Sequence, residues 1–147
     1  MKSKELVLKT SSKEETHKIA QRWAEEYFEG KIIGLKGELG AGKTEFVRGA
    51  VKGLGADPQE VRSPSFTLMN VYEGRLPIFH FDLFRLHSWA DLESIGFFEF
   101  TGQGTVFIEW PDRVPEVMGF LEILIEFKDL GPQRELRLVL DPQGPSK

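Results

Sequence analysis

Apolar side chains recur along the chain at two spacings, and segments of the two kinds alternate. Short apolar runs at 6–8, 31–35 and 105–109 predict strands, because a buried strand needs only a few consecutive apolar residues. Between the first two runs, apolar residues return every third or fourth position, which predicts a helix. Ser12 and Glu15 form a capping box at the start of this helix, and Gly30 ends it.

The rest of the chain continues this alternation. Further helices are expected at 46–54 and 88–95, and further strands at 65–72, 76–82, 121–127 and 136–140. Glu73-Gly74-Arg75 and the turn at 129–131 are short enough to join the strands on either side into hairpins. The pattern predicts the α/β class, with a mixed sheet flanked by helices and a C-terminal β-hairpin. We expect residues 1–141 to form a single domain and residues 142–147 to form a polar C-terminal tail.

A glycine-rich segment separates the strand at 31–35 from the helix that follows it. Gly37-Glu38-Leu39-Gly40-Ala41-Gly42-Lys43-Thr44 matches G-x-x-x-x-G-K-[ST], the pattern of a phosphate-binding loop, or P-loop. Its glycines let the backbone wrap around phosphates, and the next helix directs its positive N-terminal end at them. Lys43 is expected to neutralise the β- and γ-phosphates, and the Thr44 hydroxyl to ligate Mg²⁺. The domain is therefore predicted to be P-loop NTPase-like.

The composition narrows the classes of protein that fit. The 147 residues include no cysteine, which excludes disulfide scaffolds and thiol chemistry. Lys and Arg total 19 against 23 Asp and Glu, and this net charge of −4 argues against an independent, high-affinity nucleic-acid binder. No apolar run reaches membrane-spanning length, and no signal-peptide apolar region follows Met1. We therefore expect a cytoplasmic protein with no membrane partner.

Four motifs, in the same order, resemble those of the TsaE family of P-loop ATPases. They are the P-loop segment 37–44, Ser63-Pro64-Ser65-Phe66-Thr67, His80-Phe81-Asp82-Leu83-Phe84-Arg85-Leu86 and Glu109-Trp110-Pro111. The resemblance implies a slowly hydrolysing ATPase that assists the TsaB–TsaD complex in making threonylcarbamoyladenosine beside the anticodon of tRNA. It also implies that ATP and Mg²⁺ are the cofactors, and that contact with tRNA is indirect or weak.

The same resemblance implies roles for individual residues. Glu109 follows a buried strand, where a carboxylate suits a magnesium site beside a P-loop threonine, and in the family it is a magnesium ligand. By resemblance, Asp82 helps to order the magnesium waters or the attacking water, and Ser65 lies in a segment that senses the γ-phosphate. Trp110 resembles a tryptophan near the nucleotide, and Lys13 falls near the adenine-side contact. The expected catalytic residues are Lys43, Asp82 and Glu109, the metal ligands are Thr44 and Glu109, and the nucleotide contacts are Lys13, Gly37, Glu38, Leu39, Gly40, Ala41, Gly42, Lys43, Thr44, Glu45, Ser65 and Trp110.

Glu45 departs from the family pattern, which usually has a second threonine there with a hydroxyl that reaches the α-phosphate. A carboxylate cannot donate that hydrogen bond, and it repels phosphate although it suits the helix dipole. We expect Glu45 to point away from the nucleotide and the nucleotide affinity to be reduced. His80, close to Asp82 in the sequence, is expected to be a packed or surface histidine.

A P-loop alone does not select a reaction, because many NTPases and kinases share it. Three functions therefore remain open from the residues: an accessory ATPase, a small-molecule phosphotransferase and a non-enzymatic nucleotide sensor. Phosphate release without an acceptor separates the first function from the second. A partner-dependent rise in hydrolysis separates the first function from the third.

Overall fold

The computed structural model describes residues 4–38 and 42–143, so Leu39, Gly40 and Ala41 of the P-loop motif and residues 144–147 of the expected tail lie outside the described residues. The strands are β1 (Lys4–Thr10), β2 (Ile32–Lys36), β3 (Met69–Glu73), β4 (Pro77–Asp82), β5 (Thr105–Glu109), β6 (Ile123–Asp129) and β7 (Arg134–Leu140). The helices are α1 (Lys13–Trp23), the π-helical turn η1 (Ala24–Phe28), α2 (Lys43–Gly53), α3 (Trp89–Ser94), α4 (Phe97–Phe100), and the 3₁₀ segments η2 (Pro58–Glu60), η3 (Pro111–Arg113) and η4 (Pro115–Phe120). Within this described part, no helix has the length and apolar composition needed to cross a membrane.

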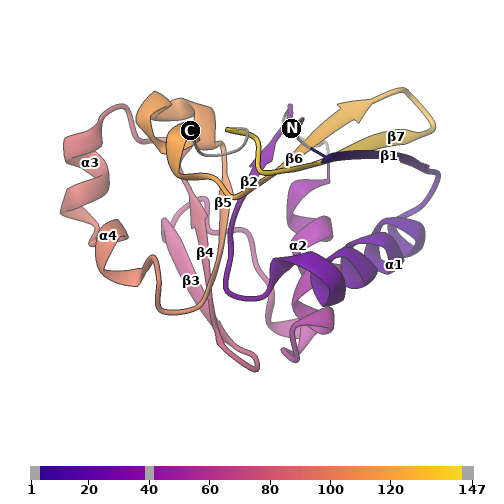
Figure 1. Cartoon of the computed structure of the whole chain (residues 1–147), viewed down its shortest axis with the longest axis horizontal. Coiled ribbons are helices and arrows are strands. Elements are labelled where there is room, and N and C mark those ends of the chain that lie inside the picture. Colours follow the sequence, from indigo (N-terminus) through magenta and orange to yellow (C-terminus); the bar gives the residue numbers. More distant parts are fainter. Residues whose placement is uncertain (1–3, 39–41, 144–147) are drawn as a thin grey trace.

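The strands form one mixed sheet in the order β1-β7-β6-β2-β5-β4-β3 (Figure 1). β6, β2, β5 and β4 run parallel to one another, and antiparallel strands extend this centre on both sides. The predicted C-terminal hairpin is confirmed, with β6 paired to β7 from Ile123↔Leu140 to Asp129↔Arg134. β1 pairs with the outer side of β7, so the N-terminal strand lies beside the C-terminal one.

Helices cover both faces of the sheet, as the predicted fold class requires. On β5, Phe107 packs into an apolar cluster with residues of α1 and α2. Its neighbours Val106 and Ile108 point to the other face and pack into a cluster with residues of α3, α4 and η4. Figure 1 shows α1 and α2 together, far from α3 and α4. Burial on both faces explains why the central strands are continuous apolar runs in the sequence.

Close packing holds the C-terminal half of α2 against α1. A Cβ atom on Gly49 would lie 2.5 Å from the carbonyl oxygen of His17, and one on Gly53 would lie 2.5 Å from that of Gln21. Only glycine permits this approach of the two backbones, because any side chain would overlap the facing helix. The packing brings His17 beside the first turn of α2, where the functional site begins.

The predicted strand at 65–72 is wrong in its first half. Residues 65–68 form a turn, and β3 begins at Met69. Leu68 has a left-handed backbone, with φ of 68°, and its N–H donates to the carbonyl of Pro64 at 2.8 Å. That conformation cannot continue a strand, so the polar residues of this segment turn toward the end of β4 instead.

Two helical regions also differ from the predicted pattern. The helix expected to run to Gly30 changes at Ala24 into the π-helical turn η1. The sequence pattern does not predict α4 or η4, because their four and six residues are too few to display a helical period.

Candidate functional site

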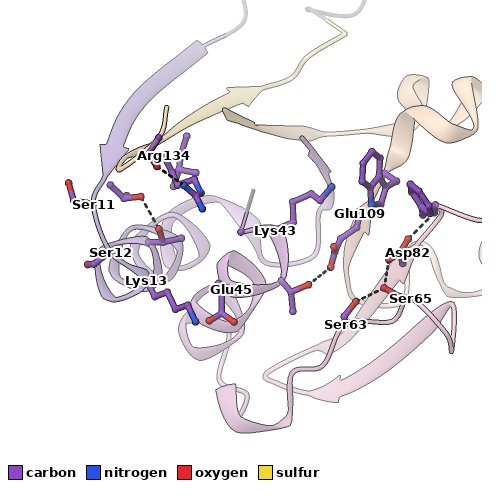
Figure 2. A pocket seen from close by; sticks show the side chains of 18 of the residues that line it. Ser11, Ser12, Lys13, Lys43, Glu45, Ser63, Ser65, Asp82, Glu109 and Arg134 are labelled. Carbon is purple, nitrogen blue, oxygen red and sulfur yellow. Dashed lines mark hydrogen bonds between the residues drawn. The ribbon is translucent and has the colours of Figure 1, made fainter. Parts of the chain in front are cut away.

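A cavity of about 800 Å³ lies where the parallel strands end and α2 begins. Asp82 and Glu109 are the last residues of β4 and β5 and are paired in register. Ligands of open α/β sheets bind in this position, outside the carboxyl ends of the strands. Figure 2 shows Lys43, Glu109 and Asp82 grouped at one end of the cavity, with Ser12, Lys13 and Arg134 at the other. The cavity therefore has an end rich in phosphate-binding chemistry and a second end built from different elements.

At the end of the cavity that contains Lys43 and Asp82, Thr44 and Glu109 place two oxygen atoms that could ligate a metal ion side by side. The Thr44 hydroxyl donates to Glu109 Oε2 at 3.2 Å, and only 4% of the Glu109 surface is exposed. Hydroxyl and carboxylate oxygens are the ligands that Mg²⁺ prefers, and Mg²⁺ usually binds through one or two protein groups plus water and phosphate. Among the described residues there is no cluster of three or more His, Cys, Asp or Glu side chains that suits a metal held by protein alone. The donor set therefore fits a magnesium ion shared with a phosphate ligand.

Asp82 lies beside this pair and contacts the turn that replaces the predicted strand. Its Oδ2 accepts from the Ser65 hydroxyl at 3.2 Å, and its Oδ1 accepts from the Phe84 N–H at 2.8 Å. Burial raises the pKa of Asp82 above its ordinary value, and the nearby Glu109 carboxylate adds to this, whereas the hydrogen bonds from Phe84 and Ser65 oppose the rise. Ser63 and Ser65 are hydrogen-bonded at 2.7 Å, so Ser63 is linked to this carboxylate through Ser65.

Lys43 is buried, and its ammonium contacts a backbone carbonyl and an aromatic ring. Its ammonium donates to the carbonyl of Gly37 at 2.6 Å and lies 3.4 Å from the ring centroid of Trp110. Burial lowers the pKa of Lys43, and the carboxylates of Glu109 and Asp82 oppose that shift. Trp110 reaches this position with a left-handed backbone, φ 61°, which is uncommon for a residue with a large side chain. The strained backbone places the indole over the lysine in the wall of the cavity.

Glu45 is held by two basic side chains. Its Oε1 lies 2.9 Å from His17 Nε2 and 3.4 Å from Arg48 Nε. Burial alone would raise the pKa of Glu45, but the hydrogen bond with His17 and the charges of Arg48, His17 and Lys13 outweigh it and lower the pKa. Glu45 is therefore ionised at neutral pH, and its carboxylate is directed to α1 and to the next turn of α2.

We expect the Glu45→Thr variant to bind ADP and ATP about three- to thirtyfold more tightly than the parent. A threonine hydroxyl at this position can donate to an α-phosphate oxygen, and the change removes a negative charge next to the nucleotide. Glu45→Gln is the matched control, because it removes the charge without placing a hydroxyl in the first helical turn. Isothermal titration calorimetry in low and high salt separates the contribution of the new hydrogen bond from that of the removed charge, since the charge contribution shrinks as salt rises. Weaker binding by Glu45→Thr would mean that the contacts with His17 and Arg48 order the start of α2 for nucleotide.

The structure brings most of the expected nucleotide contacts to this one cavity. Gly37 and Glu38 are described but do not line it, although Gly37 binds the Lys43 ammonium. Leu39, Gly40 and Ala41 lie outside the described residues. The expected site residues that line the cavity are Lys13, Gly42, Lys43, Thr44, Glu45, Ser65, Asp82, Glu109 and Trp110.

Part of the cavity wall comes from residues that sequence reasoning missed. The β6–β7 hairpin contributes Gly131, Pro132 and Arg134, and the segment after β4 contributes Phe84 and Arg85. The hairpin residues carry no motif, so no sequence signal marks them. Phe84 and Arg85 lie within the His80–Leu86 motif, and that membership is the one signal that marks them.

The family follows from a comparison with known proteins. The family model "Threonylcarbamoyl adenosine biosynthesis protein TsaE" matches residues 10–136, which is most of the chain. The chain belongs to the TsaE family. The role of this family is in the biosynthesis of threonylcarbamoyladenosine in tRNA.

Individual TsaE proteins match over similar lengths. The tRNA threonylcarbamoyladenosine biosynthesis protein TsaE of Bacillus subtilis (strain 168) is 35% identical over 96% of this chain and 80% of its own length. The TsaE protein of Treponema pallidum (strain Nichols) is 43% identical over 69% of this chain and 76% of its own length. The crystal structure of Bacillus subtilis YdiB superposes with a TM-score of 0.71 at 30% identity, covering 97% of this chain and 90% of that one.

Proposed function

We propose that this chain is a Mg²⁺-dependent ATPase of low basal rate that acts with the TsaB–TsaD complex in tRNA threonylcarbamoyladenosine biosynthesis. The observation that carries the proposal is the 3.2 Å contact between the Thr44 hydroxyl and the buried Glu109 carboxylate, at the start of α2 and beside Lys43. A hydroxyl, a carboxylate and a lysine in this arrangement are the groups that a magnesium nucleotide needs. Membership of the TsaE family supports the tRNA-modification part.

Each side chain has a distinct task in the proposed reaction. Mg²⁺ would supply positive charge to the β- and γ-phosphate oxygens, and Thr44 and Glu109 are the residues that would hold it. Lys43 exchanges the Gly37 carbonyl and the Trp110 ring for phosphate oxygens, which restores the hydrogen bonds that its buried ammonium needs. Asp82 is fixed by the Phe84 N–H and the Ser65 hydroxyl, so it can orient a water molecule toward the γ-phosphate.

The arrangement of arginines supports a low basal rate. Arg85 lines the cavity, but its guanidinium lies 4.5 Å from the ring centroid of Phe66 in the Ser63–Thr67 turn. Because an arginine finger supplied in trans contributes about 10³–10⁵ in rate in related reactions, a partner that supplies one would raise the rate of this chain.

Phosphate release from ATP by the purified chain tests this function. We expect slow release that needs Mg²⁺, needs no acceptor molecule and rises when the TsaB–TsaD complex is added. Release that requires a small-molecule acceptor would indicate a phosphotransferase. Tight nucleotide binding with no release, alone or with the complex, would indicate a nucleotide sensor. Fast release that is unchanged by the complex would contradict an accessory role.

A further inference from the structure

A series of hydrogen-bonded, buried polar side chains leads away from the proposed magnesium site. His80, on the central part of β4, is fully buried. Its Nε2 lies 2.6 Å from Glu109 Oε2, the same oxygen that accepts from the Thr44 hydroxyl. Its Nδ1 lies 2.9 Å from the hydroxyl of Tyr72 on the neighbouring strand β3. Both ring nitrogens are therefore engaged, one on each side of the histidine.

Tyr72 connects this series of polar side chains to the Ser63–Thr67 segment, which contacts Asp82 through Ser65. Its hydroxyl accepts from the N–H of Arg62 at 3.3 Å and lies 3.2 Å from the Arg62 carbonyl. Arg62 immediately precedes the Ser63–Thr67 segment. A continuous series of contacts thus runs from the base of that segment, through Tyr72, His80 and Glu109, to Thr44.

The position of His80 in the sheet does not require a polar residue. Its neighbours on β4, Phe79 and Phe81, are buried apolar residues, and an apolar side chain would fill the same place without the cost of burying an imidazole. The buried imidazole instead makes a short contact with a carboxylate of which only 4% of the surface is exposed. This contact restricts rotation of the Glu109 carboxylate, because rotation would break the hydrogen bond between Oε2 and the imidazole.

We propose that His80 and Tyr72 are positioning residues that hold the Glu109 carboxylate in its magnesium-binding orientation and tie it to the base of the Ser63–Thr67 segment. This inference rests on the proposed function, in which Thr44 and Glu109 bind Mg²⁺. Groups that orient a metal ligand typically change metal affinity by about 10–100-fold when they are replaced. His80 acts on Glu109 and not on the nucleotide, so its loss alters the magnesium dependence of binding and leaves magnesium-free binding unchanged.

Two amide substitutions at position 80 separate the contact with Glu109 from the contact with Tyr72. The amide nitrogen of glutamine can occupy the place of Nε2, whereas that of asparagine reaches only the place of Nδ1. Calorimetric titration of ADP, repeated over a series of Mg²⁺ concentrations and in excess EDTA, measures the magnesium dependence without turnover. We expect His80→Asn to weaken the apparent Mg²⁺ affinity by about 10–100-fold. We expect His80→Gln to stay within about threefold of the parent, because it keeps a hydrogen bond to Glu109.

Tyr72→Phe provides a milder test on the side of His80 that faces away from Glu109. It removes one buried hydroxyl and keeps the ring, and we expect the apparent Mg²⁺ affinity to fall by about two- to tenfold. If His80→Asn does not fold, as judged by circular dichroism and thermal unfolding, Tyr72→Phe decides the question. An unchanged Mg²⁺ affinity in Tyr72→Phe would then overturn the proposal.

The remaining outcomes distinguish this proposal from the proposed function. If the parent chain binds ADP with no magnesium dependence, the magnesium site itself is wrong. If the parent shows that dependence and folded His80→Asn keeps it, the site stands and the positioning role is wrong. Equal losses in His80→Asn and His80→Gln, with weaker ADP binding in EDTA as well, would show that His80 only fills space.

Discussion

The Lys43→Ala variant is expected to bind Mg-ATP about ten- to a hundredfold more weakly than the parent chain. Lys43 is 5% exposed and lines the cavity, and its ammonium contacts the Gly37 carbonyl and the Trp110 ring. A charge-assisted hydrogen bond to phosphate contributes about 1.5–3 kcal/mol, and each 1.4 kcal/mol or so is a factor of ten in affinity. The alanine side chain supplies neither the charge nor the donor.

Lys52→Ala is the matched control for this result. Lys52 lies in the last turn of the same helix, is exposed and does not line the cavity. Both variants remove one positive charge from α2, so a difference between them reports the position of the charge and not its loss. Isothermal titration calorimetry with ATP and Mg²⁺ gives both affinities. Equal affinities for Lys43→Ala and the parent would contradict the assignment of residues 37–44 as a phosphate-binding loop.

Substitution of either buried carboxylate at the strand ends is expected to reduce ATP hydrolysis by about a hundredfold or more. Glu109→Gln keeps the size of the side chain but removes the charge that would hold Mg²⁺, so we expect the magnesium dependence of nucleotide binding to weaken together with turnover. Asp82→Asn retains an oxygen for the Phe84 N–H but loses the carboxylate that faces the cavity. We therefore expect its nucleotide affinity to stay near that of the parent while turnover falls.

Glu93→Gln supplies the control for these two variants. Glu93 is an exposed carboxylate on α3, and it does not line the cavity. Phosphate release measured at saturating Mg-ATP separates the effect on turnover from the effect on affinity, which a parallel ADP titration gives. Parent-like hydrolysis by both Glu109→Gln and Asp82→Asn would leave the phosphate-binding loop in place but remove the proposed catalytic site next to it.

The sequence by itself determines most of the elements and one end of the site. Apolar periodicity predicts β2, β4, β5, α1 and α2, because a strand or helix that packs against a core repeats its apolar residues at the period of its own backbone. The glycine-lysine-threonine pattern lies within eight consecutive residues, so its chemistry is visible without any knowledge of the fold. The positions of Asp82 and Glu109 at strand ends follow from the same local reading.

Only the tertiary structure determines which side chains meet. Glu45 binds His17 across 28 positions of sequence, and His80 binds Glu109 across 29. Neither contact follows from periodicity, since each depends on how two elements pack or on the register between neighbouring strands. For the same reason β1 is placed beside β7, and the β6–β7 hairpin becomes a wall of the cavity. The turn at Ser65 forms instead of a strand because Leu68 takes a left-handed backbone, with its carbonyl bound to the Asp82 N–H. Local sequence sets the apolar period of each helix and strand. Which side chains and strands contact one another depends on residues that are distant in the sequence and that only the packed chain brings together.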